Sequence, residues 1–155
     1  MRMNIRAAAA LLLFAGCASS TPRAADPTLP RAKAVVTAEN VTPAPGSAVT
    51  DATVFSADVR YSIENFQPGT DYYIAPLFAS NKGERHTFNA LDRISEAPRI
   101  TQPEGELALR YPIRRELRHT DLARPVRIWL YVMERTGEHT TQVIGMAGPY
   151  EYTTR

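Results

Sequence analysis

The residues best suited to metal binding or acid–base catalysis in this 155-residue chain are its three histidines. His86, His119 and His139 are too far apart in sequence to form a metal-ligand motif. His119 and Asp121 have strand spacing, but exposed loop residues explain so short a pattern better. The sequence contains no Gly-x-Ser-x-Gly motif and no glycine-rich phosphate loop, and its carboxylates are dispersed. We therefore expect no catalytic residues, no metal and no cofactor.

A cluster of arginines could bind anions. Only two acidic residues, Glu116 and Asp121, interrupt the stretch from 110 to 127 that contains the cluster. The arginines of this stretch are Arg110, Arg114, Arg115, Arg118, Arg124 and Arg127. Guanidinium groups pair bidentately with carboxylates and phosphates, so the ligand could be phosphate, lipid A, wall carboxylates or an acidic protein. The alternative is a solvated loop in a protein where arginines outnumber lysines 16 to 2.

A third candidate surface is aromatic and lies on the segment Pro125–Arg135. One expected strand face carries Val126, Ile128, Leu130 and Val132, and the other carries Trp129, Tyr131 and Met133. The segment Asp71–Ser80 is similarly apolar on both faces and adds Tyr72 and Ile74 as candidates. If the two strands are neighbours, the outer face of the sheet is an aromatic patch suited to an interface. The alternative is that the connection 83–103 folds over this face and covers it.

The elements that carry these residues alternate with a period of two. Between Thr53 and Glu64, apolar residues occupy every second position, and the same holds from Gly105 to Ile113. This period indicates antiparallel strands with one buried face. Further strands are expected at Lys33–Val41, Asp71–Ser80, Pro125–Arg135 and Thr140–Tyr152, with turns such as Gln67-Pro68-Gly69-Thr70 between them. Short helical turns are expected at 114–122 and 89–95. About seven strands without a long helix predict an all-β sandwich.

The segment Val36–Ile63 resembles the start of bacterial immunoglobulin-like or fibronectin-III-like domains, which have a first strand, a Pro-Gly-Ser turn and an alternating second strand. The resemblance implies an immunoglobulin-like sandwich, although the chain lacks the Cys–Trp–Cys pattern of antibody domains. A transthyretin-like sandwich would give nearly the same pattern.

The N-terminus has the pattern of a secretory signal. Arg2 and Arg6 precede an apolar run, Ala7–Ala15, which is too short to span a bilayer. Gly16 and the single cysteine, Cys17, follow. The segment resembles a bacterial lipoprotein precursor with a signal peptidase II lipobox, although Phe14 departs from the usual Leu. The resemblance implies cleavage before Cys17 and lipidation of that residue; Ala18 after it implies the outer membrane. An ordinary cleaved signal is the alternative.

These patterns predict three parts: a signal peptide (1–16), a lipidated, Pro-rich linker (17–31) and a β-sandwich (32–155). The formal charge of +2 is too small to predict nucleic-acid binding. It disappears with Arg2 and Arg6, because 16 basic and 16 acidic residues then remain.

We expect a non-enzymatic lipoprotein of the cell envelope, anchored in the outer membrane and facing the periplasm, which acts as a binding or assembly module. Its partners would be the membrane, through the lipid, and another envelope protein or an anionic envelope component. A periplasmic inhibitor or immunity lipoprotein against a wall-degrading enzyme is the alternative. An enzyme with a dispersed site is a weaker one.

Overall fold

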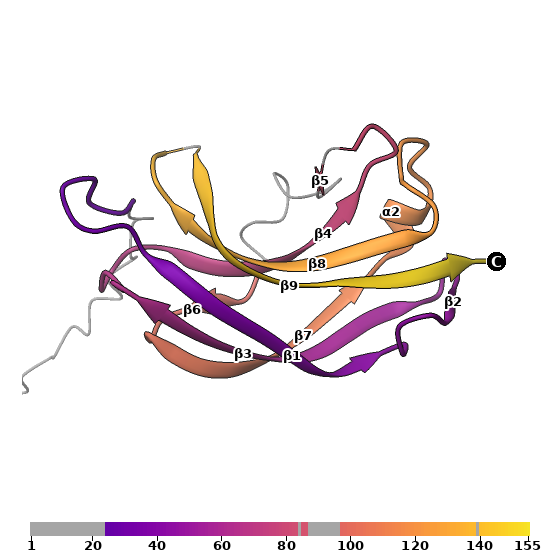
Figure 1. Cartoon of the computed structure of the whole chain (residues 1–155), viewed down its shortest axis with the longest axis horizontal. Helices are drawn as coiled ribbons and strands as arrows, with labels where there is room; N and C mark the ends of the chain where they lie inside the picture. The colour runs from indigo at the N-terminus through magenta and orange to yellow at the C-terminus, as the bar shows by residue number, and fades with distance from the viewer. Residues whose placement is uncertain (1–23, 84, 87–96, 139) are drawn as a thin grey trace, which may run out of the picture.

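The chain folds as an all-β sandwich, with one short helix in the part that the structure describes (Figure 1). The computed structural model describes residues 24–83, 85–86, 97–138 and 140–155. Two sheets lie face to face and enclose one main core. The predicted fold class is thereby confirmed, whereas the immunoglobulin-like identity stays a prediction.

The smaller sheet has the strand order β1-β3-β7, and both of its pairings are antiparallel. Its strands are β1 (Lys33–Thr42), β3 (Val54–Glu64) and β7 (Glu104–Pro112). The larger sheet has the order β2-β9-β8-β4-β5, with β6 paired to β4. Its strands are β2 (Ala48–Val49), β4 (Tyr72–Ala79), β5 (Arg85–His86), β6 (Arg99–Ile100), β8 (Val126–Arg135) and β9 (Thr141–Thr154). The six long strands coincide with the six expected segments, and β2, β5 and β6 are two-residue additions.

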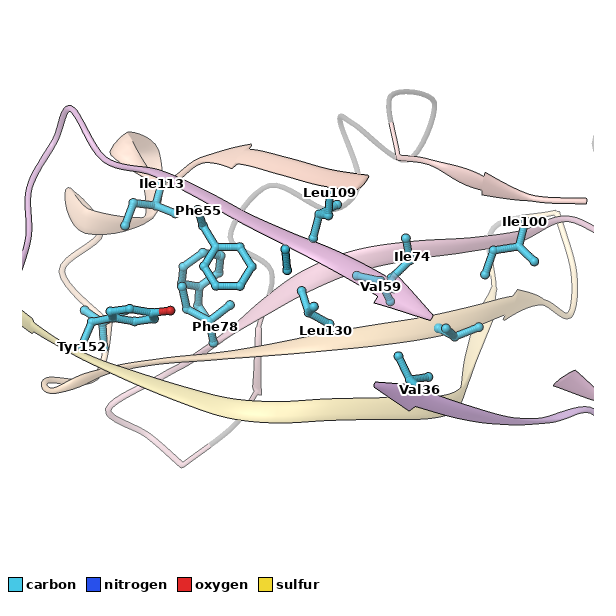
Figure 2. Close-up of a cluster of buried hydrophobic side chains, with 14 of the residues drawn as sticks. Val36, Phe55, Val59, Ile74, Phe78, Ile100, Leu109, Ile113, Leu130 and Tyr152 are labelled. Atoms are coloured by element: carbon cyan, nitrogen blue, oxygen red, sulfur yellow. The ribbon is translucent and has the colours of Figure 1, made fainter. Parts of the chain in front are cut away.

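The period-two pattern places the core. On β3, Phe55, Ala57 and Val59 are buried, whereas the alternating residues Asp58 and Arg60 are exposed. Figure 2 shows the core side chains from both sheets meeting between the layers. Its largest fully buried members are Tyr72, Tyr152, Phe55, Phe78, Ile74, Ile113, Ile128 and Leu130. The core is thus built from alternate residues of the long strands, which leaves the opposite faces for other roles.

The two sheets approach very closely where β1 passes β9. A Cβ atom built on Gly145 would overlap the carbonyl oxygen of Ala34 and lie 2.8 Å from its Cβ. Only glycine permits this contact between backbones. The crossing therefore depends on the absence of a side chain at position 145.

Residues 24–31, here called the N-terminal strap, lie against the sandwich. The backbone N–H of Ala25 donates to the carbonyl oxygen of Arg135 at 2.8 Å, and that of Asp26 donates to Oε1 of Gln67 at 2.7 Å. These bonds attach the C-terminal part of the expected linker (17–31), residues 24–31, to the sandwich. The prolines exclude a buried core there, but the backbone still bonds to the end of β8. Both sheets, the core and the strap lie within residues 24–155, so this part folds as one unit.

Candidate binding surface at the arginine end

The helix α2 (Arg114–Leu117) lies between β7 and β8 at the end of the sandwich opposite the β8–β9 turn (Figure 1). Leu117 and Glu116 are buried, and the backbone N–H of Leu117 donates to the Ile113 carbonyl oxygen at 3.0 Å. The hydroxyl of Tyr111 donates to Oε1 of Glu116 at 2.6 Å. A buried carboxylate needs such a hydrogen bond to offset the loss of hydration. These contacts fix the orientation of a helix that is too short to be stable alone.

The buried side of α2 leaves its arginines in solvent. Arg114 and Arg115 are exposed, and no hydrogen bond or ion pair joins either of them to another described residue. Both nevertheless have a defined backbone position, because Glu116 and Leu117 beside them are buried. This is the arrangement that a surface for an anion requires: free guanidinium groups on a fixed turn.

The remaining predicted arginines differ in their surroundings. Arg118 is paired with Asp51, whose Oδ2 accepts from its Nε at 2.9 Å and from its Nη2 at 2.7 Å. Arg124 donates to the Leu117 carbonyl oxygen at 3.2 Å and so caps the end of α2. Arg110 and Arg127 lie on different sheets, on β7 and β8, and both are exposed. The structure thus brings Arg114, Arg115, Arg118 and Arg124 together around α2, with Arg114 and Arg115 left unpaired. We call this group the arginine end.

The predicted aromatic surface is not a free surface. β4 and β8 are neighbours, as expected, and Trp129, Tyr131 and Met133 share the outer face of β8. They are nevertheless buried, with exposures of 9%, 3% and 7%. Ala97, from the connection 83–103, packs against their cluster. Most of that connection lies outside the described residues.

Two further residues of the predicted surface face the other way. Tyr72 and Ile74 belong to the inner face of β4 and are fully buried in the main core. Tyr73 is the β4 residue opposite Met133 on the outer face. The sequence cannot choose between the two faces of β4, because both are apolar. Tyr72 and Ile74 are therefore core residues and are withdrawn as binding candidates.

Beside the buried aromatic cluster runs an open apolar groove of about 550 Å³. Its lining is Leu77, Tyr131, Val143, Ile144, Gly145 and Met146. Val143 and Met146 are 44% and 51% exposed, respectively. Their spacing of three residues would put them on opposite faces of a regular strand, so the sequence pattern does not pair them. The register shift between Val132 and Met133 in the β8–β9 pairing brings them to one side.

Of the three histidine side chains, only that of His119 lies in the described part of the chain. His119 is exposed, and its Nδ1 accepts the backbone N–H of Asp121 at 3.3 Å, which is a local turn contact. His139 and the side chain of His86 lie outside the described part. Among the residues that the structure describes, no three His, Cys, Asp or Glu side chains gather as metal ligands. No helix within the same residues has the length and apolar character needed to cross a membrane.

No family model, curated protein or solved structure matches the chain. Among its described surfaces, the arginine end combines exposure, fixed geometry and unpaired charge.

Proposed function

We propose that the chain is a lipid-anchored protein of the bacterial cell envelope whose sandwich acts as a non-catalytic binding or assembly module. The anchor would be Cys17, which follows the lipobox-like segment Phe14–Gly16. Several acyl chains on this residue would anchor the protein stably in a membrane, because a single chain gives only reversible binding. We propose that this membrane is the outer membrane and that the sandwich lies on its periplasmic side.

The binding role is supported by the two exposed guanidinium groups of Arg114 and Arg115. They lie on a helix whose orientation is fixed by the buried carboxylate of Glu116. A solvated arginine loop would not need such support. Exposed guanidinium groups on a rigid turn favour an anionic partner in the envelope. The buried aromatic cluster supports the fold rather than this contact.

Two measurements test the proposal. Radiolabelled palmitate should enter the wild-type protein and not the Cys17→Ala variant, and the label should follow the outer membrane in a density gradient. Separately, Arg114→Ala/Arg115→Ala should lose most of the binding to envelope fractions that wild type shows. The variant Arg31→Ala/Lys33→Ala removes two exposed charges elsewhere and should retain that binding. Absence of palmitate from wild type, or equal binding by both double variants, would refute the corresponding half of the proposal.

A further inference from the structure

We infer that the arginine end binds a carboxylate-bearing cell-wall polymer rather than the lipid surface that anchors the protein. This inference rests on the proposed function, because it assumes that the sandwich is held at a membrane through Cys17. It adds the chemical class of the partner and the side of the molecule on which the partner lies.

The N-terminal strap attaches to the sandwich far from the arginine end. The N-terminal strap bonds to Arg135, the last residue of β8, whereas Arg124 lies just before the start of the same strand. β8 has ten residues, and a strand rises about 3.3 Å per residue, so its two ends are about 30 Å apart. In Figure 1 the strap lies at the left of the sandwich and α2 at the right. The chain from the lipid therefore enters the domain at the end opposite the arginines.

Few residues separate the proposed lipid site, Cys17, from the sandwich. The expected linker would leave fourteen residues, 18–31, to separate Cys17 from the domain. Because the strap is bonded to the domain, only residues 18–23 lie between Cys17 and its first described residue, Ala24. Even fully extended, the seven steps from Cys17 to Ala24 span about 25 Å at most. The strap end is thus kept closest to the lipid, which favours an arginine end that points away from it.

The two ends of the sandwich differ in the charges that they expose. At the strap end, exposed bases and acids alternate, with Lys33 paired in register with Glu64. At the arginine end, no hydrogen bond or ion pair joins Arg114 or Arg115 to another described residue, and the Glu116 carboxylate beside them is buried. An anionic surface would be attracted to the second end and not to the first. Binding to the lipid surface would therefore require the arginine end, which lies at the far end of the domain from the strap, to turn towards the membrane.

The side chains at the arginine end suit a polymer better than a folded protein. The exposed side chains on and after α2 are polar: Arg114, Arg115, Arg118, His119 and Thr120. Val54, across from Pro112, is a partly exposed apolar neighbour. Protein interfaces use buried aromatic or aliphatic anchors at their centre, and this surface offers guanidinium groups instead. A flexible chain with repeated carboxylates, such as peptidoglycan with its stem peptides, needs only such charges and no complementary apolar surface.

The test uses residues 17–155 with Cys17→Ser, which keeps the whole folded unit and cannot be acylated on sulfur. Purified peptidoglycan sacculi are sedimented with wild type, with Arg114→Ala/Arg115→Ala, and with the charge-matched Arg31→Ala/Lys33→Ala. We expect the first double variant to lose about tenfold in apparent affinity and the second to stay within about twofold of wild type. Sacculi whose carboxylates are converted to amides should bind wild type as poorly as the first double variant binds untreated sacculi.

Two further arms make the result decisive. Sedimentation with vesicles of phosphatidylcholine and phosphatidylglycerol measures the lipid alternative, and equal or stronger binding to these vesicles overturns the inference. Arginine-dependent binding to a soluble acidic envelope protein, without binding to sacculi, overturns it as well but leaves the proposed function intact. Loss of arginine-dependent binding to every envelope fraction would instead refute the binding role. Thermal unfolding of each variant confirms that the exposed substitutions leave the fold unchanged.

Discussion

The side chain of Gln67 holds Asp26 by two hydrogen bonds that run in opposite directions. The backbone N–H of Asp26 donates to Oε1 of Gln67 at 2.7 Å, and Nε2 of Gln67 donates to the Asp26 carbonyl oxygen at 3.4 Å. An amide side chain can both accept and donate, so Gln67 pairs with this residue as a backbone peptide would. Together with the bond from Ala25 to Arg135, the contact attaches the N-terminal strap to the sandwich.

Replacing Gln67 should release the strap. Gln67→Ala removes both hydrogen bonds, and Gln67→Glu keeps an acceptor for the Asp26 N–H but has no donor for its carbonyl oxygen. We expect trypsin to cleave after Arg31 several-fold faster in both variants, with a loss of about 1–2 kcal/mol in the free energy of unfolding for Gln67→Ala. Gln102→Ala, at an exposed position, is the control. Unchanged cleavage after Arg31 would show that the strap is not held by Gln67.

The buried carboxylate under α2 gives a second prediction. Oε1 of Glu116 accepts from the Tyr111 hydroxyl at 2.6 Å, and both residues precede the exposed turn at Arg118. Tyr111→Phe and Glu116→Gln should each destabilise the protein by about 1–3 kcal/mol, because each alters a buried hydrogen-bonded pair. In a double-mutant cycle the double variant should cost clearly less than the sum of the single variants. Additive losses in urea unfolding would mean that the two groups do not interact.

The strands were predictable because their chemistry is periodic. On β3 one face is buried and the other is charged, so alternation fixes both the element and its orientation. On β4 every residue is buried or half-buried, so the same alternation could not tell the inner face from the outer one. That is why Tyr72 and Ile74 were assigned to a surface that they do not share.

The parts that the sequence did not predict depend on backbone geometry. Val143 and Met146 come to one side through a register shift, which leaves no mark in the pattern of residue types. Asp26 bonds through its backbone N–H and carbonyl group, which every residue other than proline has. Glu116 lies in a run of arginines, where a solvated carboxylate is the ordinary expectation, and its burial follows only from the packing of α2. Of the candidate site, the sequence supplied the arginines and the structure supplied their support.

The β1–β9 crossing gives a third prediction. Gly145→Ala would place a Cβ atom against the Ala34 carbonyl oxygen, so one of the two strands has to shift. Overpacking of this kind costs about 1–3 kcal/mol, and we expect the free energy of unfolding to fall by that amount. The control is Val143→Ala on the same strand, which removes an exposed side chain and should cost about 1 kcal/mol or less. Denaturation of both variants in urea distinguishes the effects. Equal losses would show that the backbones at 34 and 145 separate without cost.

Tyr152 makes the stability of the sandwich sensitive to alkaline pH. Its side chain is buried, its hydroxyl donates to the Pro43 carbonyl oxygen at 3.1 Å, and its ring meets Phe55 edge-on with centroids 6.3 Å apart. Burial, with a smaller contribution from the charge of Tyr150, raises the pKa of Tyr152 to about 12, from 10.0. The folded state therefore keeps the proton where the unfolded chain has lost it.

The sign of the effect follows from proton linkage. The stabilisation from the neutral phenol is fully present below the unfolded pKa near 10 and is lost as the pH rises towards about 12. A shift of about two units corresponds to at most about 2.7 kcal/mol. Burial also raises the pKa of Tyr61, Tyr72, Tyr73 and Tyr150, so wild type should lose stability steeply over this range.

Tyr152→Phe isolates the contribution of this one residue. At about pH 8 the variant should be less stable than wild type by about 1 kcal/mol, because the hydrogen bond to Pro43 is gone. Phenylalanine has no proton to lose, so the difference should shrink or reverse between about pH 10 and pH 11.5. Urea unfolding at each pH measures it. A constant difference between the two proteins across this range would show that Tyr152 ionises alike in the folded and unfolded states.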